Sequence, residues 1–498
     1  MRATRPYQAQ AIQNVHEAWT IYQSTLLVLA TGAGKTYTAG EILRSRVPEG
    51  RALWVAHRRE LIRQAKEALE AAGLQCDTEM AGEWARLRDM WGTSQCVVAS
   101  KDSLKGARLD RFDPDAFSTI VIDEAHHSTA KAYRNIVARF PKAKVLGLTA
   151  TPDRADGVGL DNVFASVAFE YGIRDAIVDG YLSPIVQKRV ECSDIDVSDV
   201  KTEKGDLAAT DLARIMNVDA VLHQIACPLV REAGDRSTIC FTASVEAAHR
   251  LVDIMAGYTQ ARCAAIDGTT PQELRERYLT AFARGDLQFL FNCAVLTEGF
   301  DAPRTSCIAM ARPTKSRALY AQCIGRGTRL APGKVDCLVL DFVGNSGRHK
   351  LVNALDVLAG KPIPDDVRKD AEEQAAKGMP SEEALRKAEQ EAIARAERAE
   401  QERLRKARAK ADVAHRAHLV DPFGDRAQRD EQERALKIAR VRAGMCTPRQ
   451  GEVLARYGFD PNMSFADAGR AFEALKACNW RPTAKIRAQF APRREAAE

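Results

Sequence analysis

Short apolar runs alternate with amphipathic stretches throughout the first 345 residues of the chain. A continuous apolar run is typical of a strand buried on both faces, and an amphipathic stretch after it is typical of a crossover helix. The runs are LLVLA (26–30), ALWVA (52–56), CVVAS (96–100), TIVID (119–123) and VLGLTA (145–150), then STICFTA (237–243), CAAID (263–267), FLFNCAV (289–295), CIAMA (307–311) and CLVLDF (337–342). Because the pattern restarts after residues 180–184, we expect two α/β lobes in tandem, each built on a parallel sheet.

The composition changes at about residue 365. From there the sequence loses its strand-like runs and becomes dense in Ala, Glu, Arg and Lys, with charges of both signs at helical offsets. This pattern predicts one long solvated helix or a pair of helices, broken at residues 421–425. Because the apolar positions form no sustained heptad seam, we expect a charged arm or spacer rather than a coiled coil.

The last segment carries its own helix signals. We expect Thr447 as an N-cap followed by Pro448, Gly458 as the C-cap, and Ser464 as the cap of a second helix. The apolar face of that second helix is predicted to contain Phe465, Ala468, Phe472 and Leu475. The predicted parts are lobe 1 at 1–180, lobe 2 at 181–350, the charged helical arm at 351–443 and a small two-helix module with a basic tail at 444–498.

Composition argues against several classes of protein. The sequence has no stretch of about 18 uncharged apolar residues, and its start lacks the apolar core of a signal peptide, so we expect no membrane association and a cytoplasmic location. The 12 cysteines are scattered without the spacing of a zinc site, so we expect reduced thiols and no zinc. A net charge of +6 permits binding to a polyanion without demonstrating it.

A glycine-containing loop with a lysine follows the first apolar run. Glycines let a backbone approach phosphate groups closely, and a helix that begins there adds its dipole, so the loop is a predicted ATP phosphate site. We expect Lys35 to neutralise the β- and γ-phosphates and Thr36 to bind Mg²⁺. The strict pattern fails because Leu29 stands where a glycine is usual, and a chance glycine-rich turn is the alternative.

Two adjacent carboxylates, Asp123 and Glu124, follow the run TIVI. The end of that strand is expected to face the phosphate loop, because the carboxyl ends of parallel strands share one edge of a sheet. Asp123 can then hold Mg²⁺ and Glu124 can position the water that attacks the γ-phosphate. The alternative is an ordinary helix N-terminus with favourable acidic residues, which the pairing with the phosphate loop disfavours.

These two motifs, together with others in the same order, resemble superfamily 2 helicases and translocases of the DEAH-lettered kind. The other matching segments are 5–8, 55–61, 100–104, 148–152, 241–244, 296–303 and 322–329. The resemblance covers residues 1 to about 350 and implies two tandem RecA-like lobes that hydrolyse ATP while acting on nucleic acid.

The resemblance also implies residue roles in ATP binding and hydrolysis. The ATP-binding residues are Arg5 and Gln8 at the adenine, Thr31, Gly32, Ala33, Gly34, Lys35 and Thr36 at the phosphates, and Gly299 and Asp301 from the second lobe. The catalytic residues are Lys35, Asp123, Glu124, Gln322, Arg326 and Arg329. Arg326 and Arg329 are expected to reach the γ-phosphate and stabilise charge in the transition state.

Nucleic-acid contacts are implied in the same way. The contacting residues are His57, Arg58, Lys101, Thr242 and Thr297, and those that couple the ATP state to the strand are Thr149, Thr151 and His126. Such contacts go to phosphate and sugar, so binding should depend on salt more than on base sequence.

Within the superfamily, segments 148–157, 180–184 and 339–345 look most like RadD-type DNA repair helicases, near the XPB-like branch, and related phage proteins. This implies single-stranded, forked or branched DNA as substrate, in repair, recombination or replication. The C-terminus departs from relatives that carry a cysteine zinc module, because Cys446 and Cys478 stand alone. Residues 365–498 are the candidate site for a protein partner, and Arg449, Arg456, Lys485 and Arg487 could bind DNA.

Two other functions remain open at this point. An RNA helicase would use the same core, because motifs do not reveal discrimination at the 2′-hydroxyl. An ATP-gated clamp or recruitment protein would bind nucleic acid with little turnover, although Glu124 and both arginines favour hydrolysis.

Overall fold

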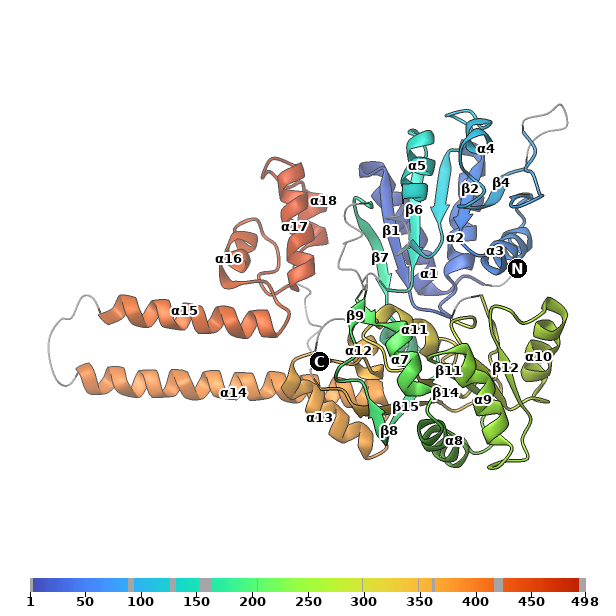
Figure 1. The fold of residues 1–498 in the computed structure, drawn as a ribbon. Coiled ribbons are helices and arrows are strands. Elements are labelled where there is room, and N and C mark those ends of the chain that lie inside the picture. The colour runs from blue at the N-terminus through green and yellow to red at the C-terminus, as the bar shows by residue number, and fades with distance from the viewer. Residues whose placement is uncertain are drawn as a thin grey trace. The chain divides into compact units, whose positions relative to one another are not determined.

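The computed structural model describes residues 3–87, 94–125, 131–151, 163–203, 205–297, 299–347, 349–360, 363–415 and 424–491 (Figure 1). By their internal contacts these residues form two units, Met1–Ala388 and Glu389–Glu498. His126 lies outside the described residues, as do residues 421–423 of the predicted helix break at 421–425 and residues 492–498 of the predicted basic tail.

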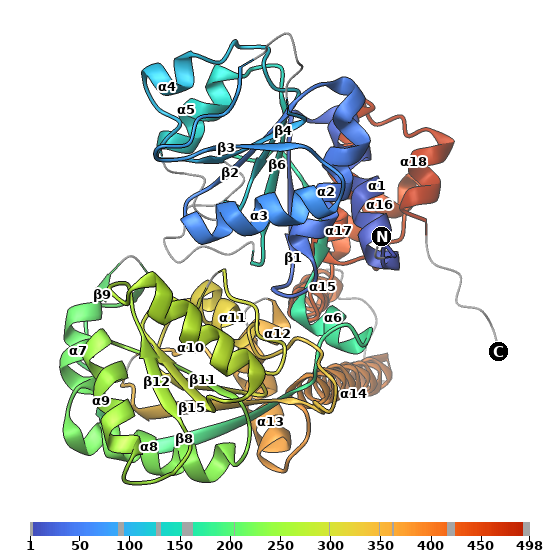
Figure 2. The ribbon, with the colours of Figure 1, turned by 90° about the vertical axis from the view of Figure 1, so that its right-hand side faces the viewer.

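The first unit begins with a seven-stranded parallel sheet of order β3-β4-β2-β5-β6-β1-β7 (Figure 2). The strands are β1 (Ser24–Leu29), β2 (Ala52–Ala56), β3 (Cys76–Glu79), β4 (Cys96–Ser100), β5 (Thr119–Ile122), β6 (Lys144–Thr149) and β7 (Val167–Tyr171). The helices are α1 (Pro6–Ile21), α2 (Lys35–Arg46), α3 (Arg59–Ala71), α4 (Ala107–Asp110), α5 (Lys131–Arg139) and α6 (Ile173–Val178), with a 3₁₀ turn at Val47–Glu49.

The central strands of this lobe are buried on both faces, as the apolar runs predict. Alternate residues such as Leu53 and Val55 of β2 face a core with Phe112, Tyr133 and Phe140. Trp54, which lies between them in β2, is also fully buried, on the side where α3 packs against β2 and β4. The predicted α/β lobe is therefore confirmed.

A second parallel sheet of six strands follows, in the order β12-β13-β11-β14-β15-β8. Its strands are β8 (Ile185–Asp196), β11 (Thr238–Thr242), β12 (Cys263–Ile266), β13 (Phe289–Asn292), β14 (Cys307–Ala311) and β15 (Cys337–Asn345), with a small antiparallel pair β9 (Thr202–Glu203) and β10 (Asp206–Leu207). The helices of this lobe are α7 (Ala209–Met216), α8 (Asp219–Ala233), α9 (Val245–Met255), α10 (Gln272–Arg284), α11 (Arg317–Ile324), α12 (Ala354–Ala359) and α13 (Asp365–Ala376).

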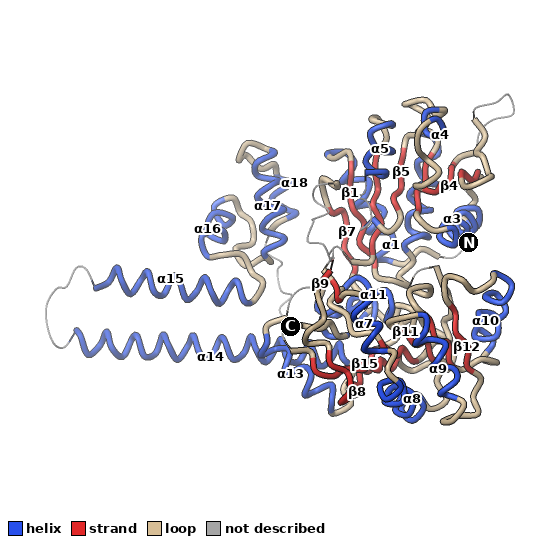
Figure 3. The backbone as a smooth tube through the Cα atoms, viewed as in Figure 1, coloured by secondary structure: helices blue, strands red, loops and turns tan. Residues whose placement is uncertain are grey.

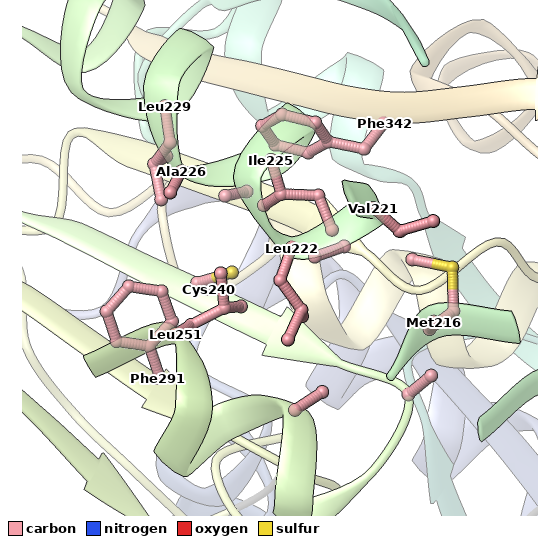
Figure 4. Packing of buried hydrophobic residues seen from close by; sticks show 14 of the residues in the cluster. Met216, Val221, Leu222, Ile225, Ala226, Leu229, Cys240, Leu251, Phe291 and Phe342 are labelled. Carbon is pink, nitrogen blue, oxygen red and sulfur yellow. The ribbon is translucent and has the colours of Figure 1, made fainter. Parts of the chain in front are cut away.

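The core of the second lobe forms where α8 and α9 meet the sheet (Figure 4). Leu222, Ile225 and Leu229 of α8 are fully buried against side chains of the strands, among them Phe291 and Phe342. The fold therefore consists of two tandem RecA-like lobes, as predicted. Because the strands of each large sheet are parallel, their carboxyl ends all lie at one edge of that sheet.

Helices beyond β15 belong to the second lobe as well. The long helix α14 (Ser381–His415) begins there, and its Glu382 carboxylate accepts a hydrogen bond from the backbone N–H of Ile185 at 3.2 Å. Ala384 and Leu385 of the same turn are fully buried. The start of the charged segment is thus anchored to the sheet.

The second unit contains the remaining helices, which form a pair and a small bundle (Figure 3). They are the rest of α14, then α15 (Gly424–Arg442), α16 (Pro448–Arg456), α17 (Phe465–Ala477) and α18 (Ala484–Gln489). Of the two predicted alternatives for the charged segment, a pair of helices is observed, and Arg403 of α14 lies 4.0 Å from Glu431 of α15.

The predicted C-terminal module needs two corrections. Thr447 and Ser464 cap α16 and α17 as predicted, but α18 is a third helix that the sequence analysis missed. Phe465 was predicted on the apolar face of α17 and is instead 58% exposed, because it occupies the first helical turn beyond the packed face formed by Ala468, Ala471 and Leu475. Gly458 lies one residue past the C-cap of α16, with a φ of 79°.

Among the residues that the structure describes, no helix is long and apolar enough to cross a membrane. In that same part of the chain, no group of three or more His, Cys, Asp or Glu side chains is arranged to hold a metal ion.

Candidate active site

The phosphate loop connects β1 to α2 and depends on two glycines with left-handed backbone conformations. Gly32 has a φ of 88° and Gly34, the N-cap of α2, has a φ of 86°. A Cβ at Gly34 would lie 2.7 Å from the side-chain nitrogen of Gln8. The left-handed conformation therefore favours glycine at both positions, and the loop ends where the N–H groups of α2 become available to an anion.

Lys35 and Glu124 lie close together at the carboxyl ends of β1 and β5. The Lys35 ammonium lies 3.7 Å from the nearer Glu124 carboxylate oxygen. Glu124 follows β5 and has a φ of 50°, unusual for a residue with a side chain, and its N–H donates to the Asp123 carboxylate at 3.0 Å. Thr36 lies half-buried at the start of α2, so the loop and the carboxylates share one end of the sheet.

Gln8, one of the residues predicted at the adenine, contacts the backbone of the phosphate loop. Gln8 accepts a hydrogen bond from the N–H of Arg5 at 3.0 Å and donates to the carbonyl of Ala33 at 3.2 Å. The hydroxyl of Tyr7 donates to the same carbonyl at 2.6 Å. In this structure the Gln8 amide is therefore engaged by backbone groups, and adenine contact by Gln8 stays a prediction.

An aromatic cluster that the sequence analysis missed lies beside these residues. Tyr7 stacks on Tyr171 with ring centroids 4.1 Å apart, and Arg5 lies 4.6 Å from the ring centroid of Tyr181. Tyr171 and Tyr181 come from distant segments and carry no motif signal, so only tertiary structure brings them to the base of the loop.

Arg326 braces the loop 297–300 of the second lobe. Its guanidinium donates to the carbonyl of Thr297 through two nitrogens at 2.8 and 3.2 Å and to the carbonyl of Phe300 at 2.6 Å. The side chain is buried. Its role as an arginine finger stays a prediction, since these contacts occupy three of its donor groups in this structure.

Arg329 lies directly against the phosphate loop of the first lobe. A Cβ built at Gly32 would be 3.3 Å from Arg329 Cγ and 3.7 Å from its Nε. Arg329 also forms an ion pair with Asp301, and burial lowers the pKa of its guanidinium. The neighbouring Gly325 faces Thr31, where a Cβ would lie 2.5 Å from the threonine Cβ. The two loops that carry the predicted ATP contacts are therefore in contact.

Lys334 contacts residues 325–329, here called the arginine loop. The sequence analysis did not predict this role. The Lys334 ammonium donates to the carbonyls of Gly327 and Arg329, the latter at 2.6 Å. Burial lowers the pKa of Lys334 to about 8. The half-buried Lys334 thus fixes the backbone around Arg329.

A buried carboxylate lies beneath α11, the helix that leads into the arginine loop. The Tyr320 hydroxyl of α11 lies 2.8 Å from both Asp341 oxygens, and the Gln187 amide donates to one of them. Burial raises the pKa of Asp341 to about 7, because these donors offset only part of the cost of desolvating its charge. Asp341 therefore ties α11 to β15 through the hydroxyl of Tyr320.

Thr242 and Thr297, two of the residues predicted to contact nucleic acid, point inward in this structure, and their contact with nucleic acid stays a prediction. Thr242 is 1% exposed, and its hydroxyl lies 2.8 Å from the Ser244 carbonyl and 3.1 Å from that of Asn292. Thr297 is also buried, with its hydroxyl 3.4 Å from the Ala294 carbonyl. Both threonines close turns after strands, and spacing alone does not reveal that.

Other predicted residues are distributed as follows. His57, Arg58 and Lys101 lie half-buried just beyond the ends of β2 and β4. Thr149 closes the turn after β6, since its hydroxyl donates to the Thr151 carbonyl at 2.7 Å. Gln322 is buried on α11. Gly299 contacts the first lobe, because its carbonyl accepts a hydrogen bond from the side chain of Gln64.

Comparison with known proteins agrees with this arrangement. Residues 2–154 match the family model described as "Type III restriction enzyme, res subunit", and residues 218–331 match "Helicase conserved C-terminal domain". The chain is 33% identical over 367 residues to IRC3 of Saccharomyces cerevisiae, provisionally named an ATP-dependent helicase, covering 69% of this chain and 52% of the relative. Over its two lobes the chain is therefore similar to helicases of superfamily 2.

Solved structures support the fold of two tandem lobes. A fragment provisionally assigned as the HsdR subunit of a type I restriction enzyme from Vibrio vulnificus YJ016 matches with a TM-score of 0.55 and 22% identity, over 70% of this chain and 65% of that one. The type ISP restriction-modification enzyme LlaBIII, solved bound to DNA, matches with a TM-score of 0.54 and 17% identity, over 70% and 28% of the two chains. The chain spans about half the length of its yeast relative, and its RadD-like assignment stays a prediction.

The position of Arg329 predicts a large effect on turnover. Replacing Arg329 by Lys keeps the charge but removes the planar fork, so the maximal ATP hydrolysis rate should fall roughly 10³-fold. ATP binding should change only a few-fold, because the phosphate loop and Lys35 are untouched. Steady-state hydrolysis with equilibrium nucleotide binding measures both, with the exposed Arg277 of α10 changed to Lys as the control. A rate loss below tenfold would contradict the assigned position.

Asp341 predicts a pH dependence of stability. Its folded pKa of about 7 lies above the ordinary value of about 4, so the folded protein binds more protons between these pH values. The free energy of unfolding should therefore fall as pH rises from 4 through 7. Asn cannot ionise, so the melting temperature of Asp341→Asn minus that of the wild type should increase from pH 5 to pH 8. A difference that is constant with pH would show that Asp341 does not titrate in this range.

Proposed function

We propose that this protein is a helicase or translocase, an ATP-driven motor that moves on or remodels DNA. The observation that carries the proposal is the position of Arg329 of the second lobe against Gly32 of the first. A phosphate site that needs groups from both lobes is complete only when the lobes are close together. Binding and hydrolysis of ATP would then change the preferred separation of the lobes, which is the work a motor requires.

The residues present fit Mg²⁺ and ATP. The left-handed Gly32 and Gly34 keep the loop free of side chains, and Lys35 follows them directly. Thr36 and Asp123 supply the hydroxyl and carboxylate oxygens that Mg²⁺ prefers. When bound, Mg²⁺ neutralises charge on the β- and γ-phosphates and orients them for in-line attack.

The chain's own residues would divide the remaining work. Lys35, now paired with Glu124, would turn to the phosphates and leave the Glu124 carboxylate to position water. Arg329 would leave Asp301 for the γ-phosphate and stabilise the charge that develops there. Lys334 and Asp341 would act as positioning residues, because they touch the arginine loop and its helix rather than the reacting atoms.

DNA is the polymer best supported. The first lobe matches a family named for restriction enzymes, and one structural neighbour of the helicase, LlaBIII, is solved bound to DNA. His57, Arg58 and Lys101 follow strands whose ends share the edge with the phosphate loop, and they would contact the sugar-phosphate backbone of one strand. Repair, recombination and replication all use such a cycle, and the second unit, which holds most of residues 365–498, is our candidate for a protein partner.

The test is steady-state ATP hydrolysis without polymer and with single-stranded DNA, forked DNA or RNA. We expect strong stimulation by DNA, a smaller response to RNA, and loss of stimulated turnover in Lys35→Ala and Glu124→Gln. Glu124→Gln should still bind ATP, which separates catalysis from binding. Equal or greater stimulation by RNA would favour an RNA helicase, and tight ATP-dependent DNA binding without turnover would favour a clamp; either result overturns the proposal.

A further inference from the structure

Trp84 is an exposed aromatic side chain on the first lobe, in the loop that follows β3. It is 57% exposed, although a tryptophan contributes most to stability when its ring is buried. No motif includes it, and the active site described above does not use it. Its surroundings nonetheless fix its position.

The backbone before Trp84 forms a tight turn. Met80 and Glu83 exchange two backbone hydrogen bonds, at 2.8 and 3.1 Å, and Ala81 between them has a φ of 49°. The N–H of Ala81 also donates to the Ser103 hydroxyl at 3.2 Å, in the segment after β4. The turn is therefore pinned to the segment that contains Lys101.

The side chains of two arginines lie close to the ring of Trp84. The guanidinium carbons of Arg108 and Arg111 lie 4.0 and 4.9 Å from its centroid. Arg108 also donates to the Ala81 carbonyl at 2.7 Å and pairs with the buried Glu79. Trp84 stays 57% exposed beside both guanidinium groups, so part of its side chain is open to solvent.

The sheet topology places Trp84 at the end of a row of functional loops. β3 is the edge strand, next to β4, and all strands of this sheet run parallel (Figure 2). The loops after β1, β5, β2 and β4 therefore open on the same edge as the loop after β3, and they carry the phosphate loop, Glu124, Arg58 and Lys101. The turn just before Trp84, residues 80–83, lies in the next loop of this row, beside the segment that contains Lys101.

Arg108 and Arg111 bring positive charge to the ring of Trp84, and both also pair with the buried Glu79. Residues 101–111 contain four cationic side chains and two acidic ones. An exposed aromatic ring held rigid among cations is the arrangement by which proteins stack nucleobases and hold phosphates without reading sequence. A ring that is already ordered loses little entropy when a base stacks on it.

We propose that Trp84 is a base-stacking site for a single nucleic-acid strand, with Arg108 and Arg111 holding the ring in place. The proposal rests on the motor function proposed above and extends its strand path beyond Lys101. It assigns the first lobe a direct contact with a base, in addition to contacts with the backbone.

The experiment measures equilibrium binding of the full chain to a labelled oligothymidine and to an abasic strand of equal length. Trp84→Ala should weaken oligothymidine binding about fivefold or more, and Trp84→Phe should recover part of it. Binding to the abasic strand should be the same for all three proteins. The dependence of affinity on salt should not change, because stacking releases no counterions.

Ile21→Ala is the matched control, since Ile21 is an exposed apolar residue of the same lobe, 74% exposed at the end of α1, and should change neither affinity. Equal affinity of wild type and Trp84→Ala for oligothymidine would overturn the stacking site. Equal weakening on both strands would also overturn it, because that result assigns Trp84 a role in shaping the lobe. Failure of the motor proposal is seen separately, as a wild type whose ATP hydrolysis does not respond to any strand.

Discussion

The absence of a side chain at two glycines allows the lobes to meet. Gly32 leaves room for Arg329, and Gly325 leaves room for Thr31, and in both cases a Cβ would lie within 3.3 Å of an atom on the other loop. These contacts bring the second lobe to the place where the β- and γ-phosphates are expected. Glycine at these positions therefore favours a close approach of Arg329 to the loop that is expected to hold the phosphates.

Buried polar groups keep the arginine loop in that position. Arg326 and Lys334 donate hydrogen bonds to backbone carbonyls of the loops around Arg329. Tyr320 of α11 is hydrogen-bonded to the carboxylate of Asp341. Buried charges are costly unless they are fully hydrogen-bonded, so such groups define one geometry rather than add much stability. The energetic cost of desolvation is visible in the raised pKa of Asp341 and the lowered pKa of Lys334.

The sequence predicts the parts of this molecule that are encoded locally. Continuous apolar runs predict buried parallel strands, and the spacing of Lys35 and Glu124 from those runs predicts that they meet. The remaining features depend on distant partners. Thr242 turns inward because a carbonyl 50 residues away accepts its hydroxyl, and Lys334 and Trp84 belong to no motif. The exposure of Phe465 likewise follows from where the packed face of α17 begins.

The central claim is that one phosphate site is built from both lobes. Amide hydrogen exchange, followed by mass spectrometry with and without a non-hydrolysable ATP analogue in the presence of single-stranded DNA, tests it most directly. We predict that the analogue slows exchange in two segments together, 31–36 of the first lobe and 325–329 of the second. Protection confined to residues 31–36 would contradict the account, because the arginine loop would then take no part in holding the nucleotide.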